Sequence, residues 1–312
     1  MRTSVLIPAR NEPCLARTVA DVKANARGDV EIVVALDGYW PDPALPDDVV
    51  VLHRGDAKGM RPNINAMCDI ATGDFLMKLD AHCMVGEGFD VILAESCPPD
   101  GIVVPRRKAL HQDAPEVWKI DESNRKYPID AHYLSYPLEK PDDPDCGLHG
   151  TEWRARRDAR KDILIDDEMS SQGSSWFMSR GHWNRLGDMD SRLYGNFIHE
   201  FQELGLKTWL RGGSVLVNKK TWYAHLYKGK KHGRGYVLGP NGHKTGTKFV
   251  TRHWMEDRDP QAIRTMQWLV EHFAKQSGSV PGWPADWPDE VARFKRERRG
   301  PWATEQVAAV SR

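Results

Sequence analysis

The chain has 312 residues, with 44 Lys or Arg and 44 Asp or Glu, so its formal net charge at neutral pH is zero. This balance excludes a protein that binds polyanions through its overall charge, and contact with a nucleic acid would need a local basic patch. The length suits one large or two modest domains. The N-terminus predicts neither a signal peptide nor a membrane span, and five cysteines without a CxxC pair favour a reducing compartment. We therefore expect a cytoplasmic protein.

The first third of the chain alternates apolar runs with segments of helical spacing. The predicted strands lie at 4–8, 29–38, 49–54 and 73–79, and the predicted helices at 17–26 and 61–73. Continuous apolar runs separated by helices are typical of a parallel sheet covered on both faces. Ligand sites in such α/β sheets lie at the carboxyl ends of the strands.

The rest of the chain is less regular. Three prolines and clustered acids predict a surface loop at 135–150, and we expect a helix at 196–210 and a strand at 213–228. A last helix is predicted at 261–273, whose buried face would carry Ile263, Met266, Leu269, Val270 and Phe273. We find no second sheet-forming region. These patterns predict one α/β domain over residues 1–252 and a helical C-terminal extension over 253–312.

A carboxylate and an imidazole follow the strand at 73–79. Asp80 and His82 are two positions apart, so both side chains can point to the same side if the extended geometry persists beyond the strand. A carboxylate oxygen beside an imidazole nitrogen suits a divalent ion such as Mn²⁺. The plain alternative is a helix-capping Asp and a surface His.

Residues 219–252 carry nine Lys or Arg and no Asp or Glu. Six glycines between 229 and 246 predict a mobile loop over 226–250. Such a loop could close over a diphosphate, with Lys228, Lys230, Lys231 or Arg234 meeting phosphate. A solvated basic loop and a segment that follows a nucleic-acid backbone are the two alternatives.

Four motifs occur in the order found in a known family. They are "VLIPARNE" (5–12), "EIVVALDG" (31–38), "LDAHC" (79–83) and the run from 195 to 228 that ends in "TWYAHLYK". With these motifs, residues 3–232 resemble the GT-A glycosyltransferases of family 2 type, most closely the catalytic domain of the polypeptide N-acetylgalactosaminyltransferases. The resemblance implies a GT-A fold, a Rossmann-like mixed and mainly parallel sheet flanked by helices, and makes 1–252 the catalytic domain.

The resemblance also implies roles for single residues. Asp80, His82 and His225 match the family's ligands for Mn²⁺ (or Mg²⁺), and Glu200 and Glu203 match two acids of a catalytic helix. The expected donor-binding residues are Pro8, Arg10, Glu12, Asp37, Lys58, Arg61, Asp80, Trp222, Lys228, Lys231 and Arg234. The family's Trp-Gly-Gly is replaced by Phe197-Ile198-His199, which alters the acceptor side of the pocket.

The implied activity is metal-dependent transfer of a sugar from a UDP-sugar to a hydroxyl group. We favour retention of the anomeric configuration, while an inverting enzyme would use one of the helix acids as its base. The acceptor is expected to be a protein Ser or Thr, a glycan or another hydroxyl. A phage-type DNA glycosyltransferase acting on 5-hydroxymethylpyrimidines in a host cytoplasm is an alternative. A non-catalytic module that binds nucleotide sugars or nucleic acid, and a hydrolase of the same donor, are the rivals from other classes.

Overall fold

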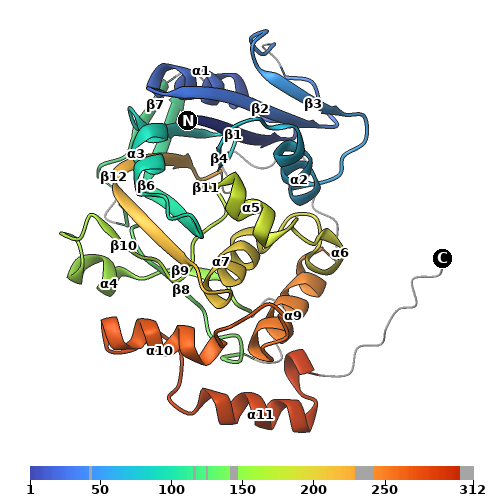
Figure 1. Ribbon diagram of the computed structural model, residues 1–312, viewed down its shortest axis with the longest axis vertical. Coiled ribbons are helices and arrows are strands. Elements are labelled where there is room, and N and C mark those ends of the chain that lie inside the picture. The colour runs from blue at the N-terminus through green and yellow to red at the C-terminus, as the bar shows by residue number, and fades with distance from the viewer. Residues whose placement is uncertain (42–43, 115–116, 124–125, 141–146, 229–241, 303–312) are drawn as a thin grey trace.

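A ten-stranded mixed sheet runs through the molecule with helices on both of its faces (Figure 1). The computed structural model describes residues 1–41, 44–114, 117–123, 126–140, 147–228 and 242–302. The sheet has the order β10-β12-β6-β11-β4-β1-β2-β3, with β5 paired to β12 and β7 to β6, and β8 and β9 form a second sheet of two strands. The strands are β1 Arg2–Ala9, β2 Asp29–Asp37, β3 Val50–Arg54, β4 Phe75–Leu79, β5 Cys83–Val85, β6 Gly101–Ala114, β7 Val117–Ile120, β8 His132–Leu134, β9 Gly150–Glu152, β10 Ile165–Asp167, β11 Ser175–Ser179 and β12 Ser214–Leu226.

Most helices cover the large sheet, and the last three α-helices gather at one end of the molecule (Figure 1). They are α1 Leu15–Asn25, α2 Met60–Ile70, α3 Phe89–Ser96, α4 Arg154–Ala159, α5 Arg180–Leu186, α6 Ser191–Tyr194, α7 Glu200–Leu210, α9 Gly242–Met255, α10 Met266–Ser277, α11 Trp287–Glu297 and the 3-10 turn η1 Gly300–Trp302. No helix among the described residues is long and apolar enough to cross a membrane.

The expected parallel core is confirmed. Strands β3, β2, β1 and β4 run parallel to their neighbours in that order. Val5, Leu6 and Ile7 of β1 have no exposed surface, because helices cover both faces of this central strand. Parallel strands end at the same edge of a sheet, so the residues that follow β1, β2 and β4 lie side by side.

Strand β12 brings a distant part of the chain to this edge. It pairs in parallel with β6 and antiparallel with β5, and the second pairing sets His225 opposite Cys83. The register shifts between Asn218 and Trp222, which marks an irregularity in the middle of the strand. His225 is thereby placed next to the residues that follow β4.

Two expectations for the middle of the chain are wrong. A second small sheet exists, since His132–Leu134 pairs with Gly150–Glu152. The described part of 135–150 is also more than a surface loop, because Tyr136, Leu138 and Leu148 are buried. Residues 141–146 lie outside the described residues. The apolar side chains in this proline-rich stretch pack in the same core as α10 and α11, which proline and charge content do not predict.

The expected mobile loop over 226–250 is wrong at its C-terminal end, where α9 begins at Gly242. Thr247, Val250 and Trp254 of this helix are buried, so packing overrides the low helix propensity of its glycines. The helix also runs through the expected domain boundary at 252/253. Residues 229–241, with Lys230, Lys231 and Arg234, lie outside the described residues.

The last predicted helix begins later than its spacing suggested. Thr265 caps α10, and its hydroxyl accepts a hydrogen bond from the backbone N–H of Trp268. Met266, Leu269, Val270 and Phe273 are buried as expected, but Ile263 lies before the helix and is 77% exposed. The described cysteines Cys14, Cys68, Cys83 and Cys97 are free thiols, as the composition predicted.

Candidate active site

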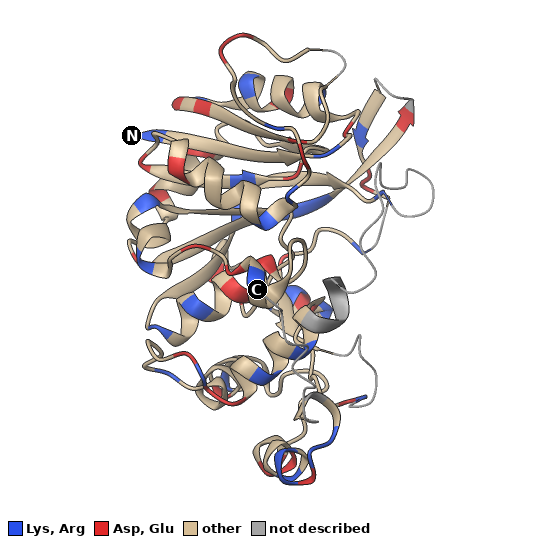
Figure 2. Cartoon of the chain, turned by 90° about the vertical axis from the view of Figure 1, so that its right-hand side faces the viewer, with Lys and Arg blue, Asp and Glu red and all other residues tan. Residues whose placement is uncertain are grey.

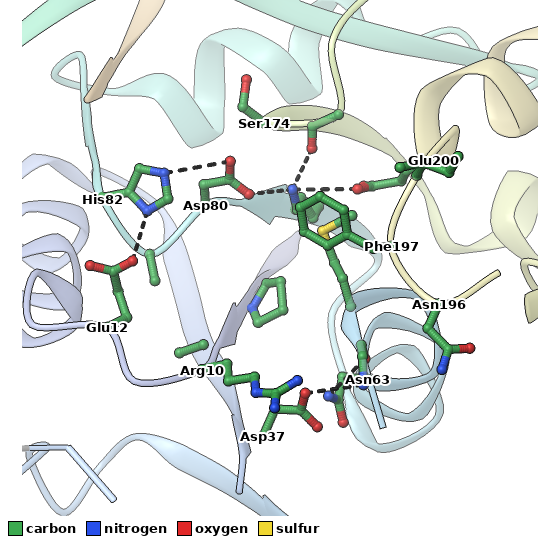
Figure 3. A pocket seen from close by; sticks show the side chains of 18 of the residues that line it. Arg10, Glu12, Asp37, Asn63, Asp80, His82, Ser174, Asn196, Phe197 and Glu200 are labelled. Carbon is green, nitrogen blue, oxygen red and sulfur yellow. Dashed lines mark hydrogen bonds and ion pairs between the residues drawn. The ribbon is translucent and has the colours of Figure 1, made fainter. Parts of the chain in front are cut away.

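A cavity of about 870 Å³ opens at the carboxyl edge of β1, β2 and β4 and extends to the N-terminus of α7 (Figure 3). Ten of the predicted site residues line it, namely Pro8, Arg10, Glu12, Asp37, Lys58, Asp80, His82, Glu200, His225 and Lys228. Arg61, Glu203 and Trp222 do not line it. Lys231 and Arg234 lie outside the described residues.

Asp80, His82 and His225 meet in this cavity. The Oδ2 atom of Asp80 is 3.1 Å from Nε2 of His225 and 3.9 Å from Nε2 of His82. Candidate ligand atoms of the three residues all lie within 4.8 Å of one another. Asp80 and His82 lie beyond the end of β4 at Leu79, so a turn brings them together rather than the strand alternation that the spacing suggested. The backbone N–H of Asp80 fixes this turn by donating to Ser174.

His82 already has the tautomer that a metal ligand needs. Its Nδ1 is 3.1 Å from Oε2 of Glu12. Burial alone would raise the pKa of Glu12, but His82 and the Lys228 ammonium hold this pKa below its ordinary value, so Glu12 is a carboxylate and accepts the Nδ1 proton. The lone pair of the imidazole is then on Nε2, which faces Asp80. A carboxylate on the far nitrogen is the usual partner of a metal-bound histidine.

His225 is neutral but has the opposite tautomer. Its pKa is lowered to about 3, mainly by burial and also by the nearby Arg107 guanidinium, although the hydrogen bond to Asp80 opposes the shift. Nη2 of Arg107 is 3.2 Å from Nδ1 of His225. Arginine can only donate, so Nδ1 accepts and the ring proton lies on Nε2, facing Asp80. Coordination through Nε2 therefore requires this proton to leave and the Arg107 contact to rearrange.

The chemistry of the three side chains fits a divalent cation of intermediate softness. A carboxylate and two imidazoles converge, and each side chain retains some exposure to the cavity. Burial alone would raise the pKa of Asp80, but the Lys78 ammonium and the His225 hydrogen bond hold it well below its ordinary value. Asp80 is therefore a carboxylate at neutral pH and can serve as a ligand.

Lys78 is a site residue that the sequence did not reveal, because it lies inside an apolar strand. Its side chain is 1% exposed, and Nζ lies 2.5 Å from Oδ1 of Asp80 and 3.5 Å from Oε2 of Glu200. Nζ also donates to the carbonyl of Gly173. Burial alone would lower the pKa of Lys78, but the two carboxylates raise it above its ordinary value. A buried ammonium ion thus joins Asp80 of the candidate metal site to Glu200.

Glu200 lies at the cavity with one oxygen bonded to a tryptophan. Its Oε1 accepts a hydrogen bond of 2.5 Å from Nε1 of Trp176. Burial raises the pKa of Glu200, although Lys78 and this hydrogen bond oppose the shift. Of the two predicted helix acids, Glu200 is the one that reaches the cavity.

Asp37 organises the loop that leads into α2. Its two carboxylate oxygens accept hydrogen bonds from the backbone N–H groups of Lys58, at 2.6 Å, and Gly59, at 3.0 Å. Gly59 has a φ of 95°, a conformation that glycine adopts without strain. Asp37 lines the cavity as predicted. Its hydrogen bonds to Lys58 and Gly59 hold this loop against the end of β2.

Arg61 and Glu203 form a buried ion pair behind the cavity wall, contrary to the prediction that both meet ligands. Neither side chain is more than 1% exposed, and Glu203 also pairs with Lys207 at 2.7 Å. Glu200 and Glu203 both match the family's helix acids by position. Glu203, however, faces Arg61 of α2 and not the cavity. Its role is structural, because its carboxylate neutralises a guanidinium that has no access to solvent.

Trp222 also lies away from the cavity. Neighbouring side chains of β12 alternate between its two faces, so Trp222 lies opposite Tyr223 and His225. Nζ of Lys108 lies 4.6 Å from the centre of the Trp222 ring. Tyr223 takes the inner position instead, where its hydroxyl is 2.8 Å from Ser174 Oγ.

Residues 4–151 match the model of the family described as Glycosyl transferase family 2. This segment of the chain therefore resembles a glycosyltransferase family 2 domain. The matched residues include β1, β2 and β4 with Asp37, Asp80 and His82. The third residue of the metal cluster, His225, lies beyond the matched segment.

A curated relative and solved structures resemble nearly the whole chain. A putative polypeptide N-acetylgalactosaminyltransferase 13 of Drosophila melanogaster is 24% identical over 337 residues, which cover 95% of this chain and 54% of that protein. The crystal structure of GalNAc-T7 with UDP, GalNAc and Mn²⁺ has a TM-score of 0.60 at 18% identity and covers 95% of this chain and 54% of its own. Staphylococcus aureus TarS 1–349 in complex with UDP-GlcNAc has a TM-score of 0.50 at 12% identity, over 95% of this chain and 80% of its own.

These likenesses confirm the GT-A fold that the sequence predicted. The matching family model and the curated relative both describe glycosyltransferases. The chain spans about half the length of the curated relative and of GalNAc-T7, so substrates and partners do not transfer with the fold.

Proposed function

We propose that this protein is a metal-dependent glycosyltransferase that moves a sugar from a UDP-sugar to a hydroxyl group. The observation that carries the proposal is the convergence of Asp80, His82 and His225 inside a cavity large enough for a nucleotide sugar. Solved relatives were crystallised with UDP and Mn²⁺ or with UDP-GlcNAc, which supports both the cofactor and the donor class.

The cavity residues have distinct proposed roles. When bound by Asp80, His82 and His225, Mn²⁺ or Mg²⁺ would neutralise the charge that develops on the leaving diphosphate. Pro8, Arg10, Asp37 and Lys58 line the end of the cavity at β1 and β2, where we place the uridine and ribose.

Lys228 pairs with Glu12 beside His82, so its ammonium lies where a diphosphate would approach. Lys231 and Arg234 follow it in the chain and are proposed as further phosphate contacts. Their placement lies outside the described residues.

We propose that the transfer retains the anomeric configuration. An inverting enzyme needs a carboxylate that can take the acceptor proton. Glu203 is buried against Arg61, and Glu200 is engaged by Trp176 and Lys78. These contacts favour a front-face reaction in which the leaving phosphate accepts the proton. Proton NMR of the first product formed would test this, and a product of inverted configuration would make Glu200 the base.

The activity is testable with purified protein, MnCl₂ and a panel of radiolabelled UDP-sugars. Metal-dependent UDP release that EDTA abolishes is expected, together with loss of at least about 100-fold in turnover for His82→Ala. His111→Ala is the matched control, because His111 is an exposed histidine on β6 away from the cavity. Equal turnover in His82→Ala and the parent protein would refute the proposal.

The same assay separates the rival functions. A non-catalytic module would bind UDP-sugars without turnover, whereas a hydrolase would release free sugar without an acceptor. DNA containing 5-hydroxymethylcytosine is included as one acceptor, because transfer to DNA is the alternative function that the basic segment raises. In the view of Figure 2, basic and acidic residues are interspersed over the described elements, which gives transfer to DNA no further support.

A further inference from the structure

The cavity divides into a charged half and a half that is uncharged apart from Glu200. Charged side chains gather where β1, β2 and β4 end, and they include Arg10, Glu12, Asp37, Lys58 and Asp80. The opposite half is lined by residues from 172–174 and 195–202. Among the described residues of these two segments that line it, Glu200 is the one carboxylate, and there is no Lys or Arg. Figure 3 shows Asn196 and Phe197 across the cavity from His82 and Glu12.

The segment Asn196–His199, which forms much of the uncharged half, is held rigidly from behind. The backbone N–H of Arg61 donates to the carbonyl of Asn196 at 3.1 Å, and Nη1 of the same arginine donates to the carbonyl of Ile198 at 3.1 Å. Since Arg61 is itself fixed by Glu203, the buried ion pair acts as a support for this wall. Because these hydrogen bonds fix the backbone of Asn196–His199, the side chains of this segment face the cavity in one arrangement.

His199 occupies a backbone conformation that favours glycine. Its φ is 59° and ψ is 26°, in the left-handed region, where a side chain is strained. The ring is buried, with Nε2 3.1 Å from Oγ1 of Thr247 in α9, and stacks on His149 with ring centres 5.0 Å apart. Contacts from two distant segments thus hold a strained histidine in the cavity wall, and strain of this kind clusters at ligand sites.

We propose that Asn196–His199 is the acceptor-selecting wall and that its acceptor is an uncharged saccharide hydroxyl, with His199 as the residue that determines fit. The inference rests on the proposed transferase function. Amide groups of Gln172, Asn196 and Gln202 beside the ring of Phe197 match the alternating hydroxyl and C–H surface of a sugar. A polyanion would instead require cations to neutralise its phosphates. Among the described residues the cation beside this half is Lys78, which is 1% exposed and already paired with Asp80 and Glu200.

An acceptor panel with Mn²⁺ and the active UDP-sugar tests the class of acceptor. The panel contains neutral p-nitrophenyl glycosides, sugar phosphates, a Ser/Thr-rich peptide and a 5-hydroxymethylcytosine duplex. We expect transfer to a neutral glycoside with kcat/KM at least about tenfold above any other acceptor. Preference for the duplex, the sugar phosphates or the peptide would overturn the inference while leaving the transferase function intact. Absence of UDP and Mn²⁺ binding by calorimetry would refute the transferase function itself.

Substitutions at His199 test the residue. His199→Gly adopts the left-handed conformation without strain and removes the ring, so we expect the KM for the neutral glycoside to rise about tenfold while the Kd for UDP changes less than twofold. His199→Asn, which tolerates the same backbone, should recover part of the loss. Arg298→Gly is the control for backbone strain alone, because Arg298 has a φ of 50° at the exposed end of α11. An unchanged acceptor KM in His199→Gly, or equal changes in both variants, would overturn the role of His199.

Discussion

Nε2 of His225 lies 3.1 Å from Oδ2 of Asp80, although 145 positions separate the two residues. The contact exists because β12 pairs with both β5 and β6 and carries His225 to the turn after β4. The two residues belong to different halves of the chain, so the candidate metal site forms only when β12 has paired with β5 and β6.

Glu12→Gln should weaken Mn²⁺ binding about 10- to 100-fold. The carboxylate of Glu12 accepts the Nδ1 proton of His82 and thereby leaves Nε2 available as a ligand. An amide can present its N–H to Nδ1 instead and so favour the wrong tautomer. Calorimetric titration with MnCl₂ measures the change, and Glu87→Gln, at an exposed surface ion pair, is the control. Equal affinities would show that Glu12 does not set the tautomer.

Lys78→Met should lower the free energy of unfolding by about 3–5 kcal/mol, because Asp80 and Glu200 lose their shared buried cation. Urea unfolding in EDTA measures this loss. Mn²⁺ should then stabilise the variant more than the parent protein, since a bound cation replaces the missing charge. Lys78→Met combined with Glu200→Gln should recover part of the stability. A variant as stable as the parent would contradict the role given to Lys78.

Glu203→Ala should also cost about 3–5 kcal/mol of stability, because it leaves Arg61 buried without its partner. The double variant Arg61→Met, Glu203→Leu should be more stable than Glu203→Ala, since it removes both charges. It should nevertheless lose acceptor selectivity, because Arg61 no longer holds the carbonyl of Ile198. Chemical denaturation and the acceptor panel together distinguish the two effects. A double variant with unaltered selectivity would show that the ion pair supports folding alone.

Acidification should destabilise the fold through His182. Burial lowers its pKa to about 4 from an ordinary value near 6.5, so the unfolded chain binds more protons between these values and stability falls as the pH drops through them. At pH 5 this one residue should cost about 2 kcal/mol relative to pH 7.5. His182→Gln, whose amide can take the place of Nε2 beside Thr208, should show a smaller loss in urea unfolding at the two pH values. Identical losses would exclude His182 as the source.

Much of the fold and of the metal site was predictable from local pattern. The apolar runs of β1, β2 and β4 predicted their strands, and parallel strands necessarily bring Arg10, Asp37 and Asp80 to one edge. The role of His225 came from the resemblance alone, because nothing in its own neighbourhood distinguishes it from a solvent-facing strand residue. The resemblance also misassigned Trp222, whereas the alternation of β12 places it on the face opposite His225.

The sequence by itself determined the order of strands and helices from β1 to β4, the carboxylate and imidazole after β4, and the resemblance of residues 4–151 to glycosyltransferase family 2. Those features depend on side-chain period and short motifs, which act over a few residues. Only the tertiary structure decided that Lys78 is a buried cation between two carboxylates, that Glu203 serves Arg61 and that His199 is braced by Thr247. Each of these depends on pairing between groups far apart in the chain, and burial makes such pairing necessary because an unpaired charge without access to water is too costly to retain.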